Sequence, residues 1–133
     1  GKGHIVTNMG LESGEVPYTT FMMRKDTIEN EPGFAAAFVR AIYRAQKWVW
    51  AAGDEDVAYA MQSYFPDTDI ATLSAVAKSY RATDSWTRVP TMTEDAFTRL
   101  QDILDGAGEL AARIELSELV DNSFGEAAIS EIG

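Results

Sequence analysis

Residues 16–50 constrain the fold of this chain more than any other part of the sequence. A run rich in β-branched and aromatic residues, 16–23, ends at the charged pair Arg24–Lys25. An acidic stretch that ends at Pro32 follows, and then a long aromatic-rich segment, 34–50. Short β-branched runs bounded by turn residues favour strands, whereas apolar residues repeated every three or four positions favour helices. The order therefore predicts a strand that leads into a long helix.

The first 24 residues contain all the predicted β-structure. His4–Met9 has the composition of a short strand, 10–14 that of a turn, and Pro17–Met23 that of a second strand. Proline is tolerated at the first position of a strand, where a missing N–H matters least. Two strands alone are marginally stable in water, so this element needs helices or further strands to cover it.

The remainder predicts helices. We expect a first turn at 26–30 and a long helix from Pro32 to Ala52, because proline suits the first position of a helix. Further helices are expected at 55–64, after a cap at Thr68 or Asp69, after a capping box at 91–94, and at 117–121 and 123–132. The long helix has an apolar stripe at helical spacing, predicted to face the core: Ala35, Phe38, Val39, Ile42, Ala45 and Val49. The predicted fold is mostly α, of the α+β class.

Length and charge limit the classes of function. A chain of 133 residues fits one domain, and 46% hydrophobic residues can supply a core. The net charge of −10 argues against a nucleic-acid partner, since phosphate binding needs clustered Lys and Arg. The absence of cysteine excludes disulfides, thiolate metal sites and Cys nucleophiles. No apolar run reaches the roughly 18 residues that span a bilayer.

Catalytic and metal-binding patterns are not found in the sequence. His4 is the single histidine and has no acid or serine at an interpretable spacing, so we expect no catalytic residue and no metal site. The acidic groups at 54–56, 67–69 and 94–95 precede or begin predicted helices, where carboxylates act as caps. No glycine-rich phosphate loop is present, and we expect no cofactor.

Two features of the long helix leave alternatives open. Arg40, Arg44 and Lys47 lie one turn apart and form either an anion- or partner-binding row or a solvated face. Trp48 and Trp50 cannot both share a core with Val49, so at least one is expected to be exposed or at an interface.

The candidate ligand-binding residues are Asn8, Glu15, Tyr18 and Thr19. Together with Thr7 and Thr20 they concentrate amide, carboxylate and hydroxyl groups on the predicted strands and their connection. Small-molecule pockets place a few such groups among apolar walls. The alternative is that these side chains form only the solvent-facing side of the strands.

Five ordered motifs resemble a known family: GKGHIVTNMG, GEVPYTTFMMRKD, AFVRAIYRAQKWV, SYFPDTD and ELVDNSFGEAA. They look like the C-terminal portion of the NMT1/THI5-like (SsuA-like) family, which comprises solute-binding proteins of ABC importers for nitrate, sulfonates, taurine or thiamine-precursor pyrimidines. The resemblance runs through nearly all of the chain. VPYTTF, RKD and VDNSF are its most specific parts.

The resemblance implies a type II periplasmic-binding-protein fold, in which two α/β lobes close on a ligand in the cleft between them. Residues 1–24 would supply the hinge-crossing strands and 25–133 the C-terminal helices, as a single-domain fragment. Glu15, Tyr18 and Thr19 would lie near the hinge. The implied partners are an anion or pyrimidine ligand, an ABC permease and a missing N-terminal lobe, and the implied location is periplasmic or extracytoplasmic.

Two alternatives accompany this interpretation. The chain could be a stand-alone helical protein-interaction domain with no transport role. A thiamine-precursor synthase fragment is disfavoured, because that enzyme uses histidine and a cysteine-rich motif. We therefore expect a protein that is not an enzyme. If the fragment folds alone, we expect it to hide its sheet-binding surface by strand exchange or in a helix-mediated homo-oligomer.

Overall fold

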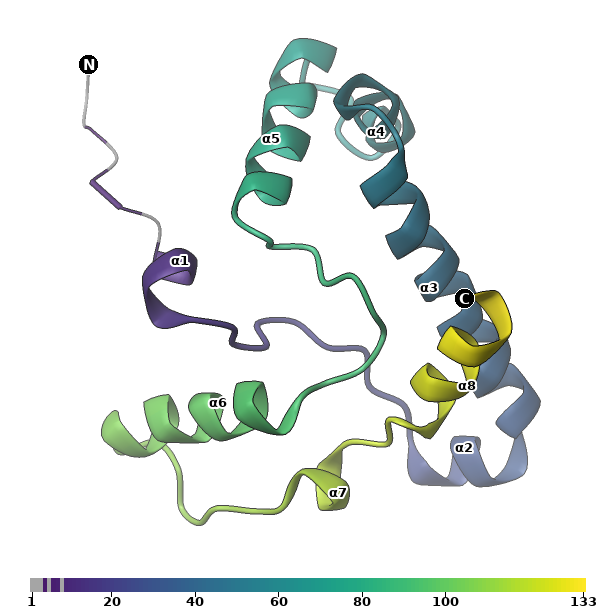
Figure 1. Ribbon diagram of the computed structural model, residues 1–133, viewed down its shortest axis with the longest axis vertical. Helices are drawn as coiled ribbons and strands as arrows, with labels where there is room; N and C mark the ends of the chain where they lie inside the picture. The colour runs from purple at the N-terminus through teal and green to yellow at the C-terminus, as the bar shows by residue number, and fades with distance from the viewer. Residues whose placement is uncertain (1–3, 5, 8) are drawn as a thin grey trace.

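The computed structural model describes residues 4, 6, 7 and 9–133. Over these residues the chain consists of helices and connecting segments, without a β-strand (Figure 1). The helices described are α1 (Met9–Ser13), α2 (Lys25–Asn30), α3 (Pro32–Ala51), α4 (Asp54–Gln62), α5 (Ile70–Ala82), α6 (Glu94–Gly106), α7 (Leu116–Leu119) and α8 (Ser123–Ile132). None of them is both long enough and apolar enough to cross a membrane.

Local sequence signals place most helix ends. Pro32 begins α3, as predicted. Asp69 caps α5 by accepting a hydrogen bond from the Thr72 amide at 2.9 Å. Asp56 accepts one from the Gly53 amide at 3.2 Å, which satisfies a free N–H group at the start of α4. The predicted capping role of these two carboxylates is confirmed.

The predicted capping box at 91–94 makes Thr91 the N-cap residue of α6, which is two residues too early. The residue that caps α6 is Thr93, whose hydroxyl accepts from the Ala96 amide at 3.2 Å. Both Thr91 and Thr93 have the right chemistry for a cap. Thr91 is excluded because the adjoining Met92 peptide is held by a distant side chain, Asn122.

The predicted two-stranded element is not formed by the described residues. Residues 10–13, expected in a turn, belong to α1, and part of the expected first strand lies outside the described residues. Residues 16–24 form neither helix nor strand, and their backbone makes no ladder of hydrogen bonds with any other described segment. A strand exists only by pairing, so a strand-like sequence without a neighbour remains an irregular crossing segment.

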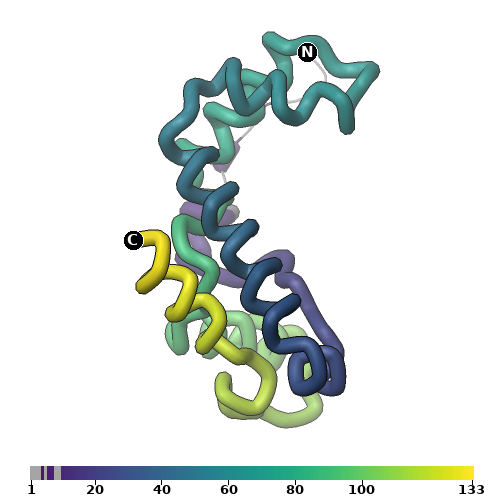
Figure 2. Tube along the Cα trace, turned by 90° about the vertical axis from the view of Figure 1, so that its right-hand side faces the viewer, coloured from purple at the N-terminus to yellow at the C-terminus, as the bar shows by residue number. Residues whose placement is uncertain are grey.

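The helices form an open, curved assembly rather than a closed layer. The spine is α3, with α8 packed along it and α2 at its N-terminal end (Figure 2). A second helical pair, α4 and α5, packs together beyond the C-terminal end of α3. Two irregular segments, the crossing segment (14–24) and the connector (83–93), run between these parts and α6 (Figure 1).

The chain buries little for its size. Its buried apolar residues are mainly small: Ala35, Tyr43, Val57, Ala58, Leu73, Ala77, Ala96, Phe97 and Ala128. Its accessible surface is 9833 Å², whereas a compact monomer of 14.6 kDa exposes about 6,900 Å². The excess, on the order of 2,000–3,000 Å², is comparable with an obligate protein interface. The described arrangement therefore leaves a surface of interface size uncovered.

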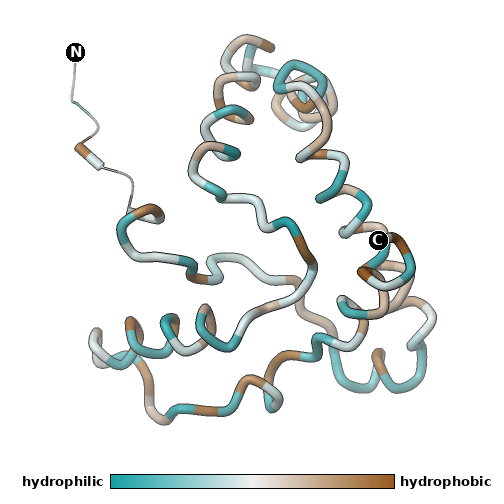
Figure 3. Tube along the Cα trace, viewed as in Figure 1, coloured by the Kyte–Doolittle hydropathy of each residue, from teal (hydrophilic) through white to brown (hydrophobic). Residues whose placement is uncertain are grey.

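The uncovered surface includes the stripe of α3 that was predicted to face a core. Of its six residues only Ala35 is buried, and all six line the concave side of the assembly. Apolar and polar residues interleave along α3, α5 and α6 in Figure 3, as amphipathic helices require. The prediction that this stripe faces a core is therefore wrong for the described residues, apart from Ala35.

The connector is packed tightly against α8. A Cβ atom added at Gly125 would lie 2.4 Å from the Pro90 carbonyl oxygen and 2.8 Å from Thr91 Cγ2. Only glycine allows helix and connector to approach this closely. Gly125 thus fixes where the connector meets the α3–α8 pair.

Replacement of this glycine should destabilise the protein. For Gly125→Ala we expect the free energy of unfolding to fall by about 1–3 kcal/mol, since the methyl group collides with backbone. Gly33→Ala is the matched control, because nothing lies within 4 Å of the added Cβ. Urea unfolding followed by circular dichroism measures both. Equal midpoints for the two variants would contradict the close contact at Gly125.

Candidate functional site

A broad, open hollow of about 2370 Å³ occupies the concave side of the molecule. The crossing segment, the connector, α3, α6 and α8 contribute to its walls. Nine large apolar residues that the structure leaves exposed line it: Leu11, Tyr18, Phe21, Met22, Phe34, Tyr80, Val89, Ile103 and Leu119. Exposed apolar residues gathered on one concave face mark a binding surface rather than ordinary solvent-facing scatter.

The crossing segment is held at its two ends and spans the hollow between them. At its start, Arg99 of α6 donates a hydrogen bond from Nη1 to the Glu15 carbonyl at 2.9 Å. Gly14 makes this approach possible, because its φ of 76° suits glycine and its Cα faces the Arg99 guanidinium. Near its end, the Phe21 ring meets Phe38 of α3 edge to face, with centroids 5.1 Å apart. Residues 17–20 therefore cross the hollow between these two contacts, one on α6 and one on α3.

The crossing segment ends in a local ion pair. Arg24 donates two hydrogen bonds to the Asp26 carboxylate, at 3.0 and 2.7 Å. This side-chain contact, with a smaller contribution from the Thr27 amide, lowers the pKa of Asp26 below its ordinary value. The pair lies where the segment enters α2 and orients that entry.

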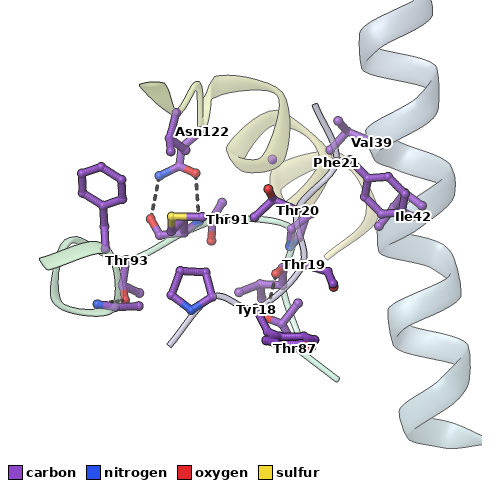
Figure 4. A pocket seen from close by; sticks show the side chains of 18 of the residues that line it. Tyr18, Thr19, Thr20, Phe21, Val39, Ile42, Thr87, Thr91, Thr93 and Asn122 are labelled. Atoms are coloured by element: carbon purple, nitrogen blue, oxygen red, sulfur yellow. Dashed lines mark hydrogen bonds between the residues drawn. The ribbon is translucent and has the colours of Figure 1, made fainter. Parts of the chain in front are cut away.

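The connector is anchored at both ends as well. Trp50 of α3 donates from Nε1 to the Trp86 carbonyl at 3.2 Å, and the Arg88 guanidinium stacks 3.5 Å from the centre of the Trp50 ring. At the other end the Asn122 side chain donates to the Met92 carbonyl at 2.8 Å and accepts from the Met92 amide at 3.0 Å (Figure 4). One side chain thereby satisfies both polar groups of a partly buried residue.

Figure 4 shows the residues where the two segments approach each other in the hollow. Tyr18, Thr19 and Thr20 of the crossing segment lie near Thr87 and Thr91 of the connector. Phe21, Val39 and Ile42 form an apolar wall beside them. The geometry brings hydroxyl groups from two distant parts of the chain to one place, beside an apolar surface.

The four residues proposed from sequence have different positions. Asn8 lies outside the described residues. Glu15 is exposed and touches α6 through its carbonyl group, while Tyr18, 98% exposed, and Thr19 are in the part of the crossing segment that spans the hollow. Glu15, Tyr18 and Thr19 therefore share one wall of the hollow, and their role in ligand binding stays a prediction.

Sequence reasoning missed the opposite wall, which includes Thr87, Thr91 and Asn122. A signal was present, because the connector carries hydroxyl residues at 83, 85, 87, 91 and 93. A threonine-rich loop alone is equally typical of a solvated turn, so the signal becomes meaningful only once the crossing segment is placed beside it.

The cationic row of α3 serves the fold. Arg40 pairs with Glu131 of α8 at 3.7 Å. Lys47 donates to the Ile132 carbonyl at 3.5 Å and to that of Gly133, and it also lies over the Tyr43 ring. Cations favour the exposed carbonyls at a helix C-terminus, so two members of the row hold the end of α8.

The prediction that at least one tryptophan of α3 is exposed or at an interface is confirmed. Trp48 is 45% exposed, whereas Trp50 is half-buried by the connector.

Within the described part of the chain no three His, Asp or Glu side chains are placed to hold a metal ion. The described residues on the concave side form an open, largely apolar surface.

Comparison with known proteins gives one informative similarity. The chain is 37% identical over 131 residues to a Bacillus subtilis (strain 168) protein described as "Putative binding protein YtlA". The match covers 98% of this chain but 39% of that protein, so the chain spans about two fifths of the length of the relative. No family model and no solved structure matches the chain.

The similarity supports the broader part of the sequence interpretation. The relative is named as a binding protein and not as an enzyme, which agrees with the expected binding role. Its name specifies neither a ligand nor an importer. The narrower assignments, to the NMT1/THI5-like family and to the type II binding-protein fold, are therefore matters of proposal.

The ion pair at the end of the crossing segment predicts a measurable pH effect. Because the pKa of Asp26 is lowered, the stabilisation from its contacts is present above the ordinary aspartate pKa and is lost as the pH falls through the lowered value. Arg24→Gln should raise the pKa of Asp26 in a carboxyl-detected NMR titration. Arg44→Gln removes the same charge elsewhere and should not. An unchanged Asp26 pKa in Arg24→Gln would contradict the pairing.

Proposed function

We propose that this chain is the C-terminal part of a solute-binding protein of an ABC importer, acting outside the cytoplasm. In this proposal the whole protein binds a small molecule between two lobes and delivers it to a permease. The family is the NMT1/THI5-like (SsuA-like) one that the sequence motifs resemble. The chain supplies the second hinge crossing and the helices that complete the first lobe.

The observation that carries the proposal is the uncovered concave face. The α3 stripe and the exposed aromatic residues on this face are apolar side chains of the kind that a second layer of structure normally covers. The accessible surface that the chain exposes beyond that of a compact monomer has the size of an obligate interface. The relative suggests where such a layer would come from, because about three fifths of that protein's length lies outside the matched region. We infer that the rest of the same polypeptide covers this face.

The covering layer in this proposal is a β-sheet. Residues 16–23 have a strand-like sequence, cross the hollow and make no backbone ladder with the other described residues. Exposed strand-forming segments pair readily with neighbouring strands. Two lobes joined by such crossings close by hinge motion, since a crossing segment can absorb the rotation in a few residues.

The crossing segment also accounts for the ligand role. Glu15, Tyr18 and Thr19 lie on the part of the chain that would pass between the lobes, and the segment is anchored at Arg99 and Phe38 rather than packed throughout. A segment held at its ends can present side chains to a ligand and also bend on closure. A stand-alone helical interaction domain offers no comparable reason for this strand-like run.

Scattering measurements test this function on the full-length protein. We expect its radius of gyration to decrease when a ligand identified by a thermal-shift screen is added, because hinge closure brings the lobes together. We also expect the upstream coding sequence to encode an α/β lobe preceded by an export signal. A start codon next to Gly1, or a bound ligand without compaction, would overturn the two-lobed receptor.

A further inference from the structure

A second group of exposed aromatic side chains lies away from the hollow. Tyr59 of α4 is 57% exposed, and Tyr64 and Phe65, on the loop between α4 and α5, are 81% and 49% exposed. None of the three lines the hollow. Their two helices stand at the opposite end of the assembly from α6 and α7 (Figure 1). We call these three residues the aromatic tip.

The helical pair that carries the aromatic tip is held together by other residues. Its buried apolar side chains are Val57, Ala58, Leu73 and Ala77. Arg81 of α5 donates to the Asp54 carboxylate at 2.6 Å and to the Ala52 carbonyl at 2.8 Å, which ties the two helices at their other end. The packing of α4 on α5 therefore does not explain why aromatic rings are exposed here.

The loop displays its two rings from an ordered backbone. The Tyr64 amide donates to the Met61 carbonyl at 2.9 Å, and the Phe65 amide donates to the Gln62 carbonyl at 3.1 Å. The Phe65 carbonyl in turn accepts from the Thr68 amide at 3.1 Å. Because these bonds already fix the backbone, little conformational entropy remains to be lost when a partner buries the rings.

The surroundings of the aromatic tip are acidic. Residues 54–69 contain five carboxylates and no Lys or Arg. Glu55 lies one turn before Tyr59 on the exposed face of α4, and Asp67 follows Phe65 by two residues. Neither of these two carboxylates forms a hydrogen bond or an ion pair within the described part of the chain. Cations on a partner would therefore be attracted to the edge of the tip, whereas anionic lipid would be repelled.

The aromatic tip is not part of the face that the proposed function covers. In the proposed receptor the rest of the polypeptide covers the concave face, which these three side chains do not line. The tip therefore stays exposed in the whole protein under that proposal. Exposed Tyr and Phe side chains bordered by charged groups are typical of the central anchors of protein interfaces.

We propose that the aromatic tip docks the receptor onto a protein surface that offers an apolar pocket bordered by Lys and Arg side chains. Tyr64 and Phe65 enter this pocket, while Glu55 and Asp67 face the cations at its border. The inference rests on the proposed function, under which this protein is the permease. It adds the surface of the receptor that docks and the chemistry of the partner surface.

Binding of the full-length receptor to the permease in nanodiscs tests this docking surface, with empty nanodiscs of the same lipids as the control. We expect binding to the permease nanodiscs alone. We also expect the affinity to fall as the salt concentration rises, because salt screens the attraction between carboxylates and cations. Equal binding to empty nanodiscs would indicate a lipid surface instead, and affinity that is independent of salt would contradict the basic border.

Substitutions at the tip test the assigned residues. Tyr64→Ser and Phe65→Ser each remove one anchor, so each should weaken permease binding by about tenfold. Asp67→Asn should reduce the salt dependence of binding. Ile114→Ser is the matched control, because Ile114 is 40% exposed between α6 and α7 and does not line the hollow. Tyr64 is mostly exposed, so its variant should keep the melting temperature of the wild type.

Wild-type affinity in both Tyr64→Ser and Phe65→Ser would overturn the docking surface and leave the receptor function standing. No binding of the wild-type receptor would overturn delivery to the permease, and this inference with it. Protection of Tyr64 from hydroxyl radicals in the full-length receptor alone would show that its own polypeptide covers the tip, which also overturns the inference.

Discussion

The contact between α8 and the connector organises the described structure. Gly125 lets the helix approach the Pro90 backbone and the Thr91 methyl group, and the Asn122 side-chain amide pairs with both backbone polar groups of Met92. Since α8 also packs along α3, this contact sets the connector against the spine and directs the chain toward α6. The position of Thr91 in the hollow, and with it one wall of the candidate site, depends on that arrangement.

A second constraint is the imbalance between apolar surface and core. The α3 stripe, Phe97 and Leu100 of α6 and the aromatic residues of the crossing segment all contribute to one concave face. The buried core is made mainly of alanines and a few larger residues. Such a distribution suits one layer of a larger structure, in which a sheet would supply the missing contacts. The partial match to a longer binding protein is consistent with that role.

Local signals were sufficient to predict most helices, because Pro32 and Asp69 act through their immediate neighbours. The same signals failed where distant residues decide. Thr91 has the chemistry of a cap, but the adjoining Met92 is held by Asn122, which lies 30 residues from Met92 in the sequence. Residues 16–23 are rich in residue types that favour strands, but a strand forms only when its backbone pairs with a neighbouring strand, which the local sequence does not determine. Only part of the candidate site could be predicted, for the same reason. Tyr18 and Thr19 were identified from their own segment of sequence, whereas Thr91 becomes a candidate only because the fold brings it near them.

Hydroxyl-radical footprinting tests the central claim, that the concave face is covered by the rest of the polypeptide. The full-length protein and the isolated 133-residue chain would be labelled under the same conditions, with Phe21, Met22 and Phe34 as reporters on the face and Tyr64, 81% exposed and outside the hollow, as reference. The account predicts strong protection of the three reporters in the full-length protein alone, with Tyr64 labelled equally in both. Equal labelling of the reporters in the two proteins would contradict it.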